Sequence, residues 1–73
     1  MLTEREVSEN FGKLIVQRCK ELGISRRDMA DEAGLTEVSV SRYVHGTRTP
    51  SLYNAYRVML ALKVIRDEPH ERI

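Results

Sequence analysis

The chain has 73 residues, of which 41% are hydrophobic, 32% are charged and one is a cysteine. A chain of this length is expected to form a single domain that buries about 60% of the surface exposed by its unfolded form. We therefore expect no separate catalytic or ligand-sensing domain, and the composition argues against disorder. One cysteine excludes an internal disulfide and a multi-cysteine metal site, and a single reduced thiol favours a cytoplasmic location.

The longest apolar run, residues 58–62, is too short for a membrane span or for the core of a signal peptide, so we expect no membrane association. The net charge is only +1, but it is unevenly distributed. Residues 1–10 carry −2, residues 11–36 carry +1, residues 37–66 carry +4 and residues 67–73 carry −2. The chain therefore has a basic middle between acidic ends. This distribution of charge is more informative about nucleic-acid binding than the net charge is.

The first predicted helix begins after Thr3. The Thr3 side chain can cap it, Glu6 can cap back three residues later, and Leu2 can pack on Val7. The apolar face of this helix comprises Val7, Phe11, Leu14, Ile15, Cys19 and Leu22. Gly23 is expected to end the helix. Gly12 lies inside it and either weakens it or marks a close backbone approach, and both alternatives stay open.

Three shorter helices follow, and no segment shows the alternation typical of strands. Ser25 caps a helix that reaches about residue 33, Thr36 caps one over about 37–45 that Gly46 ends, and Ser51 caps a fourth. The residues expected to face inward are Met29, Ala30, Ala33, Val40, Tyr43, Val44, Leu52, Ala55, Tyr56, Met59 and Leu62. The predicted fold class is all-α, a compact bundle of four to five helices.

Residues 25–46 contain two short capped helices joined by a tight turn at Gly34, with the small Ala30 at the expected crossing and Leu35 filling the turn. This arrangement is typical of a helix-turn-helix, whose second helix can enter the major groove of DNA. The ordered motifs are Ile24-Ser25, Met29-Ala30, Gly34-Leu35-Thr36, Val40-Ser41-Arg42-Tyr43, Gly46-x-Arg48-x-Pro50-Ser51 and Ala61-Leu62-x-Val64. Over about residues 11–64 the sequence resembles the phage-repressor and Cro type of helix-turn-helix regulator, the lambda-repressor-like domain. The resemblance implies a helical domain that usually binds operator DNA as a dimer.

The sequence departs from this family at two places. The family often has an arginine at position 19 and a glutamate at position 44, which form an ion pair. Here both positions are apolar, as Cys19 and Val44, so we expect a packing contact in place of the ion pair. Replacing both partners of a buried ion pair by apolar residues can leave the stability unchanged. Lys63 replaces a frequent glycine, so the fourth helix is expected to run past Leu62 towards Asp67. Little chain is then left, in the tail 67–73, for the family's fifth helix.

The outward face of the third helix is expected to read base edges. Its residues are Glu37, Val38, Ser39, Ser41 and Arg42. Arg42 is the strongest candidate because a guanidinium can bond guanine O6 and N7 together. Glu37 would repel phosphate unless it accepts a hydrogen bond from cytosine, and otherwise serves as a charge at a helix start. The alternative for the whole face is a solvated helix surface.

The predicted contacts with the DNA backbone are Arg26, Arg27, Thr36, Thr47 and Arg48. The resemblance implies this role for all of them except Arg27, and the alternative is ordinary surface charge. Candidates for a dimer surface are Tyr53, Tyr56, Val64 and Ile65. For Tyr56, a position in the core is favoured over a role in a dimer. No catalytic residue, metal ligand or cofactor is expected, since His45 has no second ligand at suitable spacing.

The favoured function is therefore a sequence-specific DNA-binding regulator, a repressor that binds double-stranded DNA as a homodimer. The alternative is a protein-interaction module of the same fold, an antitoxin or a small adaptor. The near-zero net charge and the acidic ends favour this alternative mildly. We do not expect an enzyme, because the chain lacks a Ser/His/Asp set, a phosphate-binding glycine loop and a metal cluster.

Overall fold

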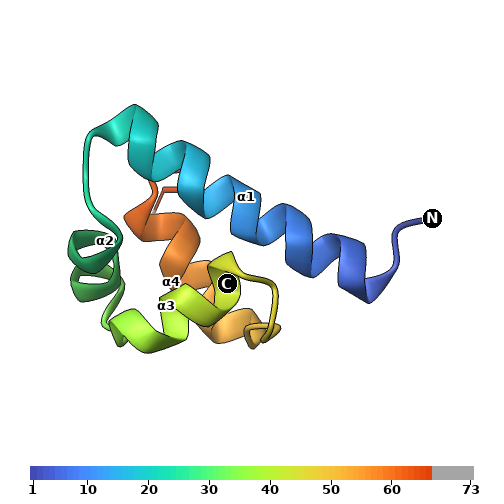
Figure 1. Ribbon diagram of the computed structural model, residues 1–73. Helices are drawn as coiled ribbons and strands as arrows, with labels where there is room; N and C mark the ends of the chain where they lie inside the picture. Colours follow the sequence, from blue (N-terminus) through green and yellow to red (C-terminus); the bar gives the residue numbers. More distant parts are fainter. Residues whose placement is uncertain (67–73) are drawn as a thin grey trace, which may run out of the picture.

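The computed structural model describes residues 1–66, which form four helices and no strand (Figure 1). The helices are α1 (Glu4–Leu22), α2 (Arg26–Ala33), α3 (Glu37–Val44) and α4 (Leu52–Ala61). The predicted all-α fold is confirmed. α1 contacts α2 and α3, and α2 also contacts α3 and α4. The first turns of α1 reach beyond the other three helices (Figure 1).

Each helix begins at the predicted hydroxyl cap. The backbone N–H of Glu6 donates to Thr3 Oγ1 over 3.1 Å, and the N–H of Thr3 donates to the Glu6 carboxylate over 2.9 Å. The bond from the Thr3 N–H, and after it the Thr3 side chain, hold the pKa of the Glu6 carboxyl below its usual value. Ser25, Thr36 and Ser51 accept the N–H of the residue three positions on, at 3.0–3.1 Å. Each such cap contributes about 1 kcal/mol to helix stability.

All four helices end in the same motif, in which a residue with positive φ follows the last turn. Gly23, Gly34 and Gly46 take this position with φ of 68°, 73° and 69°. Lys63 takes it after α4, with φ of 59°. Its N–H donates to the Leu60 carbonyl and the N–H of Val64 donates to the Met59 carbonyl, both over 3.0 Å.

The predicted continuation of the fourth helix past Leu62 is therefore wrong. α4 ends at Ala61 because Lys63 adopts the left-handed conformation, which glycine adopts more easily than other residues. Asp67, and with it the question of a fifth helix, lies outside the described residues.

Replacing Lys63 with glycine is expected to give a more stable protein than replacing it with alanine, by about 1 kcal/mol. Both changes remove the exposed Lys63–Glu32 ion pair, which spans 3.8 Å, so they differ only in how well the residue tolerates positive φ. Urea unfolding of the two variants measures the difference. Equal stability would mean that position 63 does not hold this conformation in solution.

The core lies between the four helices. Its buried residues are Ile15, Cys19, Met29, Ala30, Ala33, Val40, Tyr43, Val58, Ala61 and Leu62. The predicted inward faces of α2 and α3 are confirmed, with Val44 half-buried against the core. Burial raises the pKa of the Cys19 thiol, so the side chain stays protonated. Positions 19 and 44 are thus apolar packing positions, and their direct contact stays a prediction.

The predicted core face of α4 is partly wrong. Leu52 is 83% exposed and Tyr56 is 43% exposed, whereas Val58, which was not predicted, is fully buried. At 3.6 residues per turn, Leu52 lies about 120° and Tyr56 about 160° around the helix from Val58. The interpretation of Tyr56 as core is therefore wrong. Val7 is also exposed, because the first turns of α1 extend past the body of the molecule (Figure 1).

Gly12 marks a close approach of two backbones. A β-carbon at this position would lie 2.8 Å from the Tyr43 carbonyl oxygen and would overlap that of Val44. α1 can therefore pass directly over the end of α3 only because residue 12 has no side chain. Of the two alternatives that the sequence left open for Gly12, the close backbone approach is the one observed.

Arg18 joins α1 to the end of α4. Its guanidinium donates to the Leu62 carbonyl through Nε at 3.1 Å and Nη2 at 2.9 Å, and to the Glu21 carboxylate through Nη1 at 2.8 Å. A cation is favourable at the C-terminal end of a helix, where carbonyl groups lack partners. No sequence pattern pointed to this contact, because its two residues are 44 positions apart.

Candidate nucleic-acid interface

The turn between α2 and α3 sets the direction in which α3 leaves the body. Gly34 allows the sharp reversal, and the N–H of Leu35 donates to the Ala30 carbonyl over 2.9 Å. Leu35 packs against the core from the inside of the turn, and Ala30 is buried between the helices. α3 then begins at Glu37 and runs along an edge of the molecule (Figure 1).

The outer face of α3 is open. Val40 and Tyr43 anchor the helix in the core, and the rings of Tyr43 and Phe11 meet in a T-shaped arrangement with their centroids 6.2 Å apart. Glu37, Val38 and Arg42 are exposed, with Val38 at 60%. The five predicted base-reading residues therefore divide into three exposed and two half-buried side chains, the latter being Ser39 and Ser41.

The two serine hydroxyls have partners within the chain. Thr36 Oγ1 donates to Ser39 Oγ over 3.0 Å, and Ser41 Oγ lies 3.5 Å from His45 Nδ1. His45 Nδ1 in turn lies 2.8 Å from the Ser41 carbonyl oxygen. These bonds order the outer face of α3 at both of its ends.

Four exposed arginines on α2, on α3 and in the loop after α3 make no ion pair within residues 1–66. Arg26 and Arg27 open α2, Arg42 lies in the last turn of α3, and Arg48 follows in the loop 45–51. All four are exposed, as are the predicted backbone contacts Thr36 and Thr47. The ion pairs found in this part of the chain, at Arg5, Arg18 and Lys63, involve none of them. Unneutralised guanidinium groups on the helix-turn-helix and the loop after it suit a polyanionic partner.

A family model described as helix-turn-helix, of the Cro and phage-repressor type, matches residues 15–67. The chain belongs to this family. The match runs from the middle of α1 through α4, so the two-helix unit α2–α3 is the helix-turn-helix of a DNA-binding regulatory family. No curated protein matches the sequence significantly.

The helix-turn-helix protein also exposes an apolar surface at the start of α4. Leu52, Tyr53 and Tyr56 are exposed there, and the Arg57 guanidinium lies 5.2 Å from the centre of the Tyr53 ring. Tyr53 and Tyr56 are two of the four predicted dimer residues. The other two follow α4, where Val64 is exposed and Ile65 is half-buried. The four candidates thus come from both ends of one helix.

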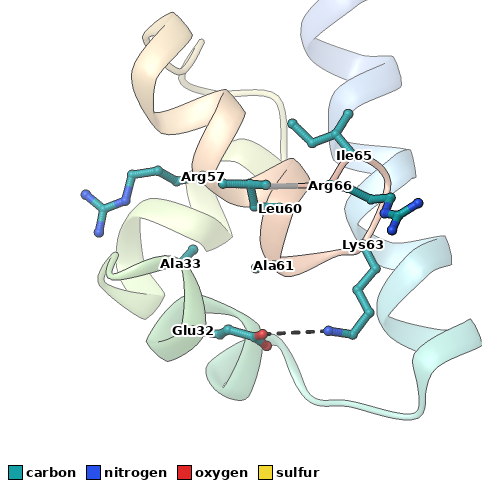
Figure 2. A pocket seen from close by; sticks show the side chains of 8 residues that line it. All are labelled: Glu32, Ala33, Arg57, Leu60, Ala61, Lys63, Ile65 and Arg66. Carbon is teal, nitrogen blue, oxygen red and sulfur yellow. Dashed lines mark ion pairs between the residues drawn. The ribbon is translucent and has the colours of Figure 1, made fainter. Parts of the chain in front are cut away.

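A pocket of about 470 Å³ lies between α2 and the end of α4 (Figure 2). Glu32 and Lys63 pair on its rim, and Arg57 points away from the cavity (Figure 2). None of the lining residues comes from α3, so the pocket is separate from the open face of the helix-turn-helix. Among residues 1–66, no three His, Cys, Asp or Glu gather to hold a metal ion, and no helix is long and apolar enough to cross a membrane.

Proposed function

We propose that this helix-turn-helix protein is a sequence-specific transcriptional repressor that binds operator DNA through α3. The observation that carries the proposal is the outer face of α3, which is exposed while its inner face is fixed in the core. The major groove is about 12 Å wide and admits one α-helix. A helix held on one side and open on the other can therefore present its side chains to base edges. Occupancy of a promoter would then exclude RNA polymerase.

In this proposal the residues of α3 have separate roles. Arg42 pairs with guanine O6 and N7, Val38 contacts a thymine methyl group, and Glu37 accepts from cytosine N4. The hydroxyls of Ser39 and Ser41, already bonded within the chain, keep acceptor capacity for a base or a phosphate. Specificity comes from these contacts because phosphate contacts carry no direct sequence information.

The backbone contacts proposed are Arg26, Arg27, Thr36, Thr47 and Arg48. The exposed arginines among them have no competing carboxylate partner within residues 1–66. Each phosphate neutralised releases condensed counterions, so binding should weaken steeply with salt. The start of α2 adds backbone N–H groups that favour a phosphate.

Replacing Arg48 with alanine is expected to weaken binding equally on operator and random duplexes. The slope of log K against log salt should also fall by about 1, because one phosphate contact is lost. Fluorescence anisotropy of labelled duplexes over a salt series measures both quantities. A loss confined to one base pair would instead assign Arg48 to base reading, and an unchanged slope would remove it from the interface.

We propose in addition that the protein binds as a homodimer through the exposed residues of α4 and the segment after it. The support is the apolar surface formed by Leu52, Tyr53 and Tyr56, since exposed aromatic side chains are enriched at interfaces. A two-fold dimer would place two α3 helices about 34 Å apart, one turn of DNA. Its operator would be a two-fold symmetric sequence.

A further inference from the structure

Ser8 is a buried polar residue on the part of α1 that reaches past the core. Its side chain is 6% exposed, and its Oγ lies 2.8 Å from Thr49 Oγ1, which belongs to the loop 45–51. The two residues are 41 positions apart, so the bond ties α1 to the connection between α3 and α4. A buried hydroxyl without a partner would be costly, and this bond satisfies it.

The loop is held on both sides of Arg48. On one side, Thr47 Oγ1 donates to the Arg42 carbonyl over 3.2 Å, which fixes the loop to the end of α3. On the other side, Thr49 is bonded to Ser8. α1 also lies against the start of the loop, since a β-carbon at Gly46 would be 3.7 Å from Glu9 Cγ. Arg48 therefore extends from a backbone whose two neighbours are anchored to different helices.

We infer that Ser8 is a positioning residue for Arg48, and this rests on the proposed function. Ser8 itself contacts no DNA in the proposed complex. Its bond to Thr49 orders the loop before binding, so that Arg48 meets a phosphate without the entropic cost of ordering the chain. α1 thereby contributes to DNA binding through Ser8, although the family match begins only at residue 15.

The test is the affinity of Ser8→Ala for duplex DNA, compared in the wild-type protein and in an Arg48→Ala background. In the wild-type background the loss should be about threefold to tenfold on operator and random duplexes alike. The salt slope should stay unchanged, because no ionic contact is removed. In the Arg48→Ala background, Ser8→Ala should have almost no further effect, since the residue acts through Arg48.

Two substitutions at the exposed partner guard against a folding effect. Thr49→Val removes the hydroxyl from a surface position and should reproduce the loss, whereas Thr49→Ser keeps the hydroxyl and should bind like the wild type. Thermal unfolding of each variant confirms that the binding assay measures folded protein.

The outcomes separate this inference from the function on which it rests. An equal loss from Ser8→Ala in both backgrounds, or wild-type affinity for both Ser8→Ala and Thr49→Val, would overturn the positioning role alone. If Arg48→Ala itself binds DNA like the wild type, the proposed phosphate contact is wrong and the inference falls with it.

Discussion

Replacing Gly12 with alanine is expected to destabilise the protein by about 3 kcal/mol, although the same change stabilises most helix interiors by roughly 0.5–1 kcal/mol. The sign reverses because the added β-carbon would lie 2.8 Å from the Tyr43 carbonyl oxygen and would overlap that of Val44. Both atoms belong to backbone at the end of α3, where the motif at Gly46 fixes the chain. Only a separation of α1 from α3 can relieve the overlap.

Urea unfolding followed by circular dichroism measures this effect. Gly23→Ala is a matched control, because nothing lies within 4 Å of its added β-carbon but its φ is 68°. It should cost about 1 kcal/mol through backbone conformation alone. The rate at which an alkylating reagent labels the buried Cys19 gives a second readout, which should rise in Gly12→Ala. A Gly12→Ala variant as stable as the wild type would show that α1 and α3 are not this close in solution.

Replacing Arg42 with alanine is expected to cost about 1–3 kcal/mol of binding free energy at the operator and to relax specificity at one base pair. The exposed guanidinium lies in the last turn of α3, without an ion-pair partner among the described residues. Its two parallel N–H groups match the acceptors of guanine, a geometry that an ammonium group lacks. Affinities for the operator and for its single-base variants measure the loss position by position.

Two variants define what the Arg42 result means. Arg42→Lys keeps the charge, so it should bind random duplexes like the wild type while still losing discrimination at that base pair. Arg5→Ala removes an exposed charge that is paired with Glu9 on α1, and its base preferences should not change. If Arg42→Ala weakens binding equally on all sequences, Arg42 contacts a phosphate and the base-reading role is wrong.

Helix boundaries could be predicted because their signals are local. A hydroxyl at Thr3, Ser25, Thr36 or Ser51 acts on an N–H three residues away, and a glycine allows positive φ by itself. The end of α4 could not be predicted in this way, since lysine disfavours the conformation that Lys63 adopts. The surrounding contacts, among them the Arg18 guanidinium on the Leu62 carbonyl, outweigh that local preference.

The rotation of α4 was harder to predict than that of α2 or α3. Apolar residues occur on several sides of α4, so helical spacing alone did not distinguish Val58 from Tyr56 as the centre of the buried face. On α3 the polar residues occupy one side, and the exposed positions of Glu37, Val38 and Arg42 follow the prediction. Ser8 gave no sequence signal because its partner Thr49 is 41 residues away.

Selection from a pool of randomised duplexes is the decisive experiment on whether α3 reads a DNA sequence. The purified protein is incubated with the pool at moderate salt, and the retained duplexes are sequenced. We expect enrichment of a two-fold symmetric site whose half-sites lie one helical turn apart. Enrichment of a single half-site would support base recognition by α3 but contradict binding as a homodimer. Salt-sensitive retention without any enriched sequence would contradict base reading by α3 and favour the protein-interaction alternative.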